Sequence, residues 1–251
     1  MFTRKTLSFL RALKRNNDRE WFRVRKADYE HHVRAPMIAL LARLAKDFAA
    51  VAPELVSDPK VSLFRIYRDT RFSADKTPLK THVAAHFPAR GFPRGEGAGL
   101  YLEVAPTWVW MGGGIYMPTP LELQAIREHV AATNQRLHRI VTAPAFTKVM
   151  GEMHGERLTR LPRGYPKDHP AAHYLQFKQF IAGREFPAEF ATTPSFYREV
   201  LKTFAATLPL VRFLNAPLLE RLTPARHPLD AAADRDLMRA AARRRSQAPM
   251  W

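Results

Sequence analysis

The sequence of 251 residues contains no cysteine, and this absence excludes several kinds of site at once. Disulfide bonds, thiolate metal sites, iron–sulfur clusters and thiol nucleophiles all require cysteine. Long apolar runs are also missing, and no stretch approaches the roughly 20 residues of a membrane-spanning helix. The N-terminus has basic residues but no apolar core followed by a small-residue cleavage site, so it reads as an amphipathic helix. We therefore expect a cytoplasmic protein without a membrane partner.

Acidic residues are scarce, since 23 Asp and Glu stand against 40 Lys and Arg and leave a formal net charge of +17. Such an excess favours association with polyanions such as nucleic acid. However, the basic residues are spread along the chain, mostly beside acids, and only Arg243, Arg244 and Arg245 form a compact cluster. A high arginine content with many alanines is also typical of proteins encoded by GC-rich genomes. Nucleic-acid binding therefore stands as an alternative to a solvated basic surface.

The hydrophobic fraction of 46% is ample for a core, and its spacing predicts a mixed fold. Helical periodicity covers about 3–14, 17–33 and 36–53, with Asn17 and Glu20 at capping-box spacing. Strand-like composition covers 61–67, 82–87 and two runs between 100 and 116. Later segments predict helices over 119–141, 145–150, 193–204 and 209–222, and a helix turn followed by a strand over 174–186. The expected fold class is α+β, an antiparallel sheet of four to six strands packed with helices.

We expect one domain over residues 1–222 and a basic tail over 223–251. The tail is rich in Ala, Arg and Asp and has few large apolar residues, so it is expected to fray or to be disordered. No internal repeat is visible in the sequence.

The stretch from Val61 to Phe87 predicts a hairpin with a long connection that is unusually rich in charge. Its cations could bind a phosphate or carboxylate, because guanidinium groups bind such anions bidentately and lysines add point charge. These candidate anion-binding residues are Arg65, Arg68, Arg71, Lys76 and Lys80. The excess of donors over local acceptors favours a pocket for a small anionic ligand.

The same charges also fit a structural interpretation. Asp69 and Asp75 could pair with the arginines and fix the long loop as a salt-bridge network without any ligand. Strand alternation places Arg65 and Asp69 on one face and Arg68 on the other, so all the arginines can converge only if the strand is irregular.

Catalysis at this stretch is a further possibility that the sequence leaves open. Asp69 or Asp75 could be a general base, His82 a proton carrier, and Ser73 or Thr77 a nucleophile, in hydrolysis or transfer at a phosphate or carboxyl derivative. Two carboxylates among several cations are expected to have lowered pKa values, which favours base roles over acid roles. Ser73 to Lys76 also spells S-x-x-K, but Pro78 argues against the helix that this motif needs.

No motif identifies a cofactor, which stays unknown. The pairs His82 with His86 and His169 with His173 lack the H-E-x-x-H context of a zinc helix, so we predict no metal site. Gly112 to Gly114 follows a strand but lacks the spacing of a phosphate-binding loop. These glycines could allow close packing against a tryptophan or leave room for a ligand.

Four separated motifs occur in order and carry a resemblance to a known family. They are N-N-x-R-E-W-F from Asn16, L-F-R-I-Y-R-D-T-R-F-S-x-D-K-T-P-x-K-T-H from Leu63, G-G-G-I-Y-M-P from Gly112, and D-H-P-A-A from Asp168. The sequence resembles the bacterial domain-of-unknown-function family numbered 2461, over about 2–219. The resemblance implies one domain and a functional role for the hairpin motif, without implying a reaction.

Overall fold

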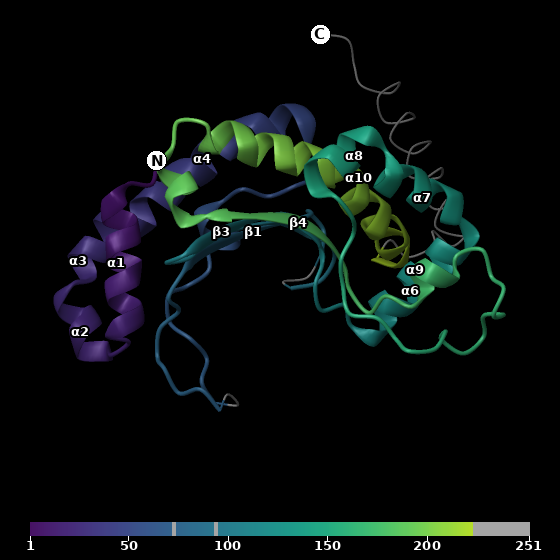
Figure 1. Cartoon of the computed structure of the whole chain (residues 1–251), viewed down its shortest axis with the longest axis horizontal. Helices are drawn as coiled ribbons and strands as arrows, with labels where there is room; N and C mark the ends of the chain where they lie inside the picture. Colours follow the sequence, from purple (N-terminus) through teal and green to yellow (C-terminus); the bar gives the residue numbers. More distant parts are fainter. Residues whose placement is uncertain (72–73, 93–94, 223–251) are drawn as a thin grey trace, which may run out of the picture.

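A four-stranded antiparallel sheet lies at the centre of the fold (Figure 1). The structure is a computed structural model that describes residues 1–71, 74–92 and 95–222. The strands follow one another in the sheet in chain order, as β1 (Val83–Pro88), β2 (Gly99–Val104), β3 (Trp108–Ile115) and β4 (Phe180–Pro187). The predicted α+β class is confirmed, with a strand count at the lower end of the expected range.

The two faces of the sheet have different surroundings. Leu100, Leu102 and Val104 are buried on the face that helices cover. Tyr101 and Glu103 alternate with them and therefore lie on the opposite face. That opposite face carries no helix layer in Figure 1, and we call it the open face.

The covered face packs against the long helix α10 (Phe196–Leu222), which lies closest to β3. Two separate helices were expected here because of Pro209, and this expectation was wrong: α10 continues through Pro209 and Pro217. A proline inside a helix costs about 3 kcal/mol. The apolar stripe of α10, which includes the buried Val200, Phe204 and Val211, offsets this cost by continuous burial on the sheet.

The N-terminal third is helical, as expected. It contains α1 (Arg4–Arg15), α2 (Arg19–Val24), α3 (Lys26–Tyr29), a π-helical turn (Glu30–Arg34) and α4 (Ala35–Val51). Phe9 contacts both Trp21 and Tyr29, with ring centroids 5.8 and 6.0 Å apart. These contacts hold α1, α2 and α3 together as an arm at one side of the sheet (Figure 1).

A second group of helices lies at the other side of the sheet. It comprises α6 (Pro120–Ala132), α7 (Asn134–Thr142), α8 (Pro144–Met150) and α9 (Ala172–Leu175). A capping box of Thr119 and Glu122 begins α6. The single helix expected over 119–141 is instead divided at Thr133, whose hydroxyl donates to the His129 carbonyl. Such local side-chain bonds compete with helix continuation.

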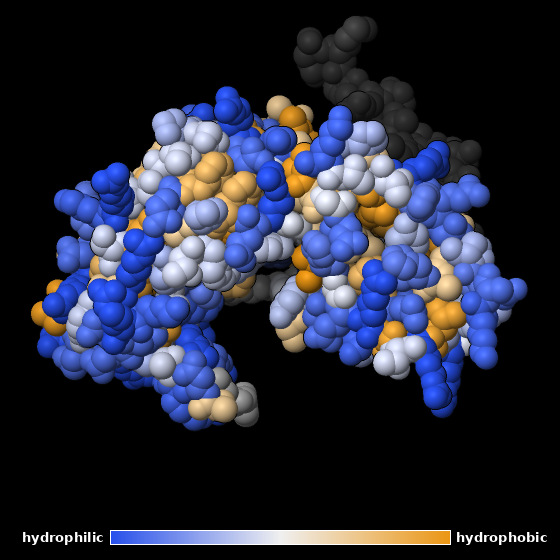
Figure 2. Space-filling view, in the orientation of Figure 1, coloured by the Kyte–Doolittle hydropathy of each residue, from blue (hydrophilic) through white to orange (hydrophobic). Residues whose placement is uncertain are grey.

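The arm of α1 to α3 and the second group, α6 to α9, which we call the second arm, both extend beyond the sheet on the side of its open face. The surface between these two arms is hollowed (Figure 2). None of the helices in the described part of the chain combines the length and apolar character that crossing a bilayer requires. The expectation for the tail over 223–251 lies outside the described residues.

Candidate functional site

The charged hairpin is present, although its first half is less regular than expected. Residues 59–62 form a single helical turn, α5 (Pro59–Ser62), whose start is capped by the Asp58 side chain. The chain then runs extended beside residues 78–85, joined by bridges between Leu63 and Ala85 and between Tyr67 and Leu79. The predicted strand over 61–67 is therefore an irregular edge that extends the sheet next to β1.

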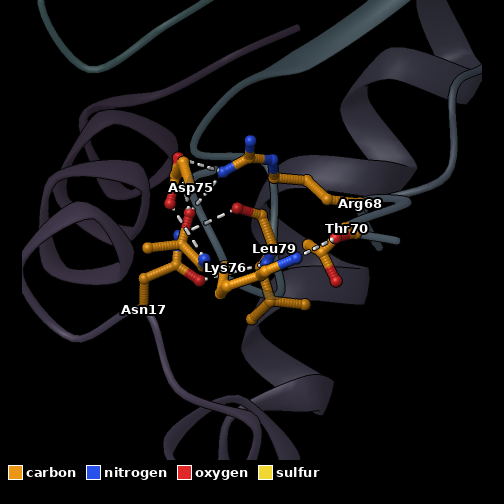
Figure 3. Close-up of polar contacts among 7 residues, drawn as sticks. Asn17, Arg68, Thr70, Asp75, Lys76 and Leu79 are labelled. Carbon is orange, nitrogen blue, oxygen red and sulfur yellow. Dashed lines mark hydrogen bonds and ion pairs between the residues drawn. The ribbon is translucent and has the colours of Figure 1, made fainter. Parts of the chain in front are cut away.

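Asn17 fastens the hairpin to the helical arm (Figure 3). Its amide donates to the Leu79 carbonyl at 2.8 Å and accepts from the Leu79 backbone N–H at 3.0 Å, as a neighbouring strand would. The expectation that Asn17 caps the second helix was wrong. Asp18 fills that role, because its carboxylate accepts from the N–H groups of Glu20 and Trp21.

The hairpin tip is an internally bonded network (Figure 3). The Arg68 guanidinium contacts the Asp75 carboxylate and the Thr77 hydroxyl, and the Thr77 N–H donates to Asp75 at 2.9 Å. The Thr77 backbone bond, together with the side chains of Arg68 and Thr77, lowers the pKa of Asp75 to about 2. Lys76 donates from Nζ to the Thr70 carbonyl at 3.0 Å.

A second pair at the tip joins Arg71 to Asp69. The guanidinium donates to both carboxylate oxygens, at 3.0 and 2.7 Å, and lowers the pKa of Asp69 to about 2. The lowered pKa values predicted for Asp69 and Asp75 are confirmed. Carboxylates with such pKa values are ionised at pH 7 and are weak bases. Ser73 lies outside the described residues.

Two of the candidate cations lie at the base of the hairpin instead of its tip. The Lys80 ammonium lies 4.5 Å from the centroid of the Phe64 ring, and burial lowers its pKa, with the charge of Arg65 adding to this effect. Within the described residues, neither the Lys80 ammonium nor the Arg65 guanidinium has a hydrogen bond or ion pair. Phe64 itself is 40% exposed. The base therefore holds Lys80 beside a partly exposed ring, and Arg65 is close enough for its charge to lower the pKa of both Lys80 and Asp69.

His82, Glu103 and Tyr101 form a hydrogen-bonded group next to Lys80. His82 Nδ1 lies 3.1 Å from Glu103 Oε1, and the Tyr101 hydroxyl donates to Glu103 Oε2 at 2.6 Å. Burial, with Lys80 adding to it, lowers the pKa of His82 to about 4, so the imidazole is neutral at pH 7. Burial raises the pKa of Glu103, although Tyr101 and Lys80 act against this shift.

This group can hold and transfer a proton. When Glu103 is ionised and His82 is neutral, the Nδ1–H donates to the carboxylate and Nε2 carries a lone pair. A histidine oriented in this way by a carboxylate is a common general base, although with a pKa of about 4 the His82 imidazole is a weak base at pH 7. Of the three catalytic candidates from the sequence, His82 has the geometry best suited to that role.

Next to His82 and Glu103, aromatic rings and glycines form the surface of the open face. A side chain built at Gly183 would place its Cβ 2.1 Å from Cζ2 of Trp110, so the indole lies across this glycine. At Gly112 a Cβ would first meet the Ala182 carbonyl oxygen, at 2.1 Å, and then Cη2 of Trp110, at 2.9 Å, so the predicted packing against a tryptophan holds for this glycine of the run. The rings of Phe64, Tyr101 and Trp110 follow one another with centroids 6.1 and 5.8 Å apart.

Residues 5–213 match the family described as "Conserved hypothetical protein (DUF2461)". The chain belongs to this family. The match confirms the resemblance that the four sequence motifs carried. No curated protein and no solved structure gives a significant match. The site of this DUF2461 protein is therefore interpreted from its own geometry.

The fold separates the eight predicted site residues into two groups. The tip network contains Arg68, Asp69, Arg71, Asp75 and Lys76, and the base contains Arg65, Lys80 and His82. Sequence reasoning missed Tyr101, Glu103 and Trp110. The signal was available, since polar and aromatic residues alternate with apolar ones along β2 and β3.

Elsewhere in the described chain, the candidate metal and ligand sites have weaker support than the hairpin base. No group of three or more potential metal ligands occurs among the described residues. His169 Nδ1 accepts from the Ala171 N–H, and His173 lies against Arg157, so each of these histidines already has a local partner. A cleft of about 390 Å³ beside α6 is lined partly by Arg127, which already donates to the carbonyls of Leu175 and Phe177.

Proposed function

We propose that this DUF2461 protein binds a small anionic ligand, bearing a phosphate or a carboxylate, on the open face of the sheet at the base of the hairpin. Lys80 and Arg65 hold the negative charge, and His82 lies beside the bound group. The observation that carries the proposal is the Lys80 ammonium, which is partly desolvated against Phe64, lies near the charge of Glu103 and has no hydrogen-bonded acceptor within the described residues. A charged donor in such a position gains most from an anionic partner.

The tip network has a different role in this proposal. Arg68, Arg71 and Lys76 already bind Asp75, Asp69 and the Thr70 carbonyl, so local acceptors meet part of their need for an anionic partner. The tip instead stiffens the hairpin that carries Lys80 and His82. In this proposal the charges at the tip form a structural salt-bridge network, and the charges at the base bind the ligand.

The experiment compares two lysines of the same hairpin. Thermal unfolding of the purified protein is followed with inorganic phosphate, ribose 5-phosphate or succinate, against sodium chloride of equal ionic strength. Stabilisation by ligand binding grows with ligand concentration relative to Kd. Lys80→Met is expected to abolish the stabilisation, and Lys76→Met is expected to retain it.

The proposal is contradicted if Lys80→Met retains the stabilisation. Loss with Lys76→Met and retention with Lys80→Met would move the site to the hairpin tip. If none of the three anions stabilises the wild-type protein, the proposed function is wrong and the hairpin is a structural element.

If the site is enzymatic, His82 is the residue that moves the proton. Its neutral imidazole would take a proton from a water molecule that attacks phosphorus or a carbonyl carbon. The bond to the leaving group then breaks with its electron pair, and the proton returns to that group. Lys80 and Arg65 would stabilise the negative charge that develops. His82→Gln should then remove turnover of any substrate found, while leaving its binding in place.

A further inference from the structure

The glycines of β3 and β4 allow an aromatic ring to lie flat on the open face. Trp110 lies above Gly183 and Gly112, where any side chain would strike the indole or the neighbouring strand. Trp110 is only partly buried and is not among the residues that pack on the hydrophobic core. A large apolar ring placed outside the core, on a floor of glycine, suggests a binding surface.

Trp110 is also close to the charged group at the hairpin base. It is the direct cross-strand partner of Glu103, whose carboxylate contacts His82 and Tyr101. Neighbouring strands lie about 4.8 Å apart, so a ligand of ordinary metabolite size can span from Trp110 on β3 to Lys80 beside β1. Phe64 and Tyr101 continue the aromatic surface along this path.

We infer that the anionic ligand carries a planar aromatic ring, which stacks on Trp110 while its phosphate or carboxylate meets Lys80 and Arg65. This inference rests on the proposed function and names the class of ligand for the same site. The nearby acid Glu185 is exposed on the same cross-strand row, so the anionic end of the ligand is directed toward Lys80 and away from β4.

The test uses two matched pairs of probes that differ only in the ring. One pair is adenosine monophosphate and ribose 5-phosphate, and the other is phenyl phosphate and ethyl phosphate. Dissociation constants are measured by isothermal titration calorimetry. Stacking of a base on an aromatic side chain strengthens binding by about tenfold or more. The ring-bearing member of each pair is therefore expected to bind about tenfold more tightly to the wild-type protein.

Variants of Trp110 assign this preference to the indole. Trp110→Leu should reduce the ratio within each pair to near one and leave the affinity for ribose 5-phosphate unchanged, whereas Trp110→Phe should keep part of the ratio. Trp21→Leu is the matched control, because Trp21 packs in the helical arm beside Phe9 and should not change the ratio.

The outcomes separate this inference from the proposed function. A ratio near one in the wild-type protein for both pairs, or a ratio that persists in Trp110→Leu, overturns the aromatic class. If the aromatic class is overturned but ribose 5-phosphate still binds, and binds less tightly to Lys80→Met, the proposed anion site is supported without the aromatic preference. Absence of binding by all four probes overturns both.

Discussion

The protonation of His82 depends on its burial and on the neighbouring Lys80. Burial and the Lys80 charge hold its pKa near 4, compared with 6.5 for an unperturbed histidine. The folded state therefore favours the neutral imidazole. The contribution of His82 to stability is present above pH 6.5 and is lost as the pH falls toward 4.

This coupling gives the first prediction. Replacing Lys80 by Met removes a positive charge beside the imidazole, so the pKa of His82 should rise from about 4 toward 6.5. The shift should be partial, because burial is the larger cause and is retained. A pH titration of the His82 ring signals by NMR measures the change. An unchanged or lower midpoint in Lys80→Met would show that the ammonium does not lie beside His82.

Gly183 supplies the second prediction. A methyl group at this position would overlap the Trp110 ring, and shifting a packed ring costs about 1–3 kcal/mol. Gly183→Ala should therefore lower the free energy of unfolding by that amount and change the near-ultraviolet circular dichroism of the indole. The double variant Gly183→Ala with Trp110→Leu should recover much of the loss, because the smaller side chain leaves room. Equal losses in the single and double variants would mean that the ring does not lie on Gly183.

At the scale of elements, the hairpin depends on a side chain from a distant helix. Asn17 makes two hydrogen bonds to the backbone of Leu79, and both are partly buried. Asn17→Ala should lower the free energy of unfolding by about 1–3 kcal/mol, since it leaves a donor and an acceptor without partners. Asn16→Ala is the control, because the Asn16 amide is exposed and bonds only within its own helix end. Urea denaturation measures both, and equal effects would refute a special role for Asn17.

The elements themselves were largely predictable, because local patterns determine them. The strands β2 and β3, the capping box at Thr119 and the helix ended by Gly151 follow from composition and cap chemistry. The errors arose where long-range packing outweighs local preference. Pro209 lies inside α10 because the helix is buried on the sheet, and Asn17 bonds Leu79 because the hairpin folds back on the arm.

The candidate site was only partly predictable for the same reason. The hairpin charges are adjacent in sequence, so their pairing at the tip could be anticipated from Asp69 and Asp75. The base, however, combines Lys80 and His82 with Tyr101 and Glu103 of β2 and Trp110 of β3. Such a group arises from sheet register, which a strand pattern alone does not specify without knowledge of the partner strand.

At the scale of the whole molecule, the charge distribution bears on the nucleic-acid alternative. Several arginines of the described surface are bound to carboxylates, including Arg11 with Glu189, Arg212 with Glu54 and Arg221 with Glu128. Pairing reduces the charge that each offers to a phosphate backbone. A filter-binding titration at low ionic strength distinguishes the cases, because an extended basic face should bind DNA or RNA most strongly there.

The final prediction concerns the cooperativity of unfolding, and it follows from the buried core. One continuous cluster of buried apolar side chains runs from Phe2 of the N-terminal arm through the sheet to Leu218 at the end of α10. Because α10 contacts β3, α6 and α8, and its Phe196 ring lies 5.9 Å from that of Phe2, loss of packing on either side would expose this shared core. Urea unfolding should therefore give one transition, with coincident midpoints for circular dichroism and tryptophan fluorescence. Two separated transitions, or two stable halves after limited proteolysis, would show that the arms fold independently of the sheet.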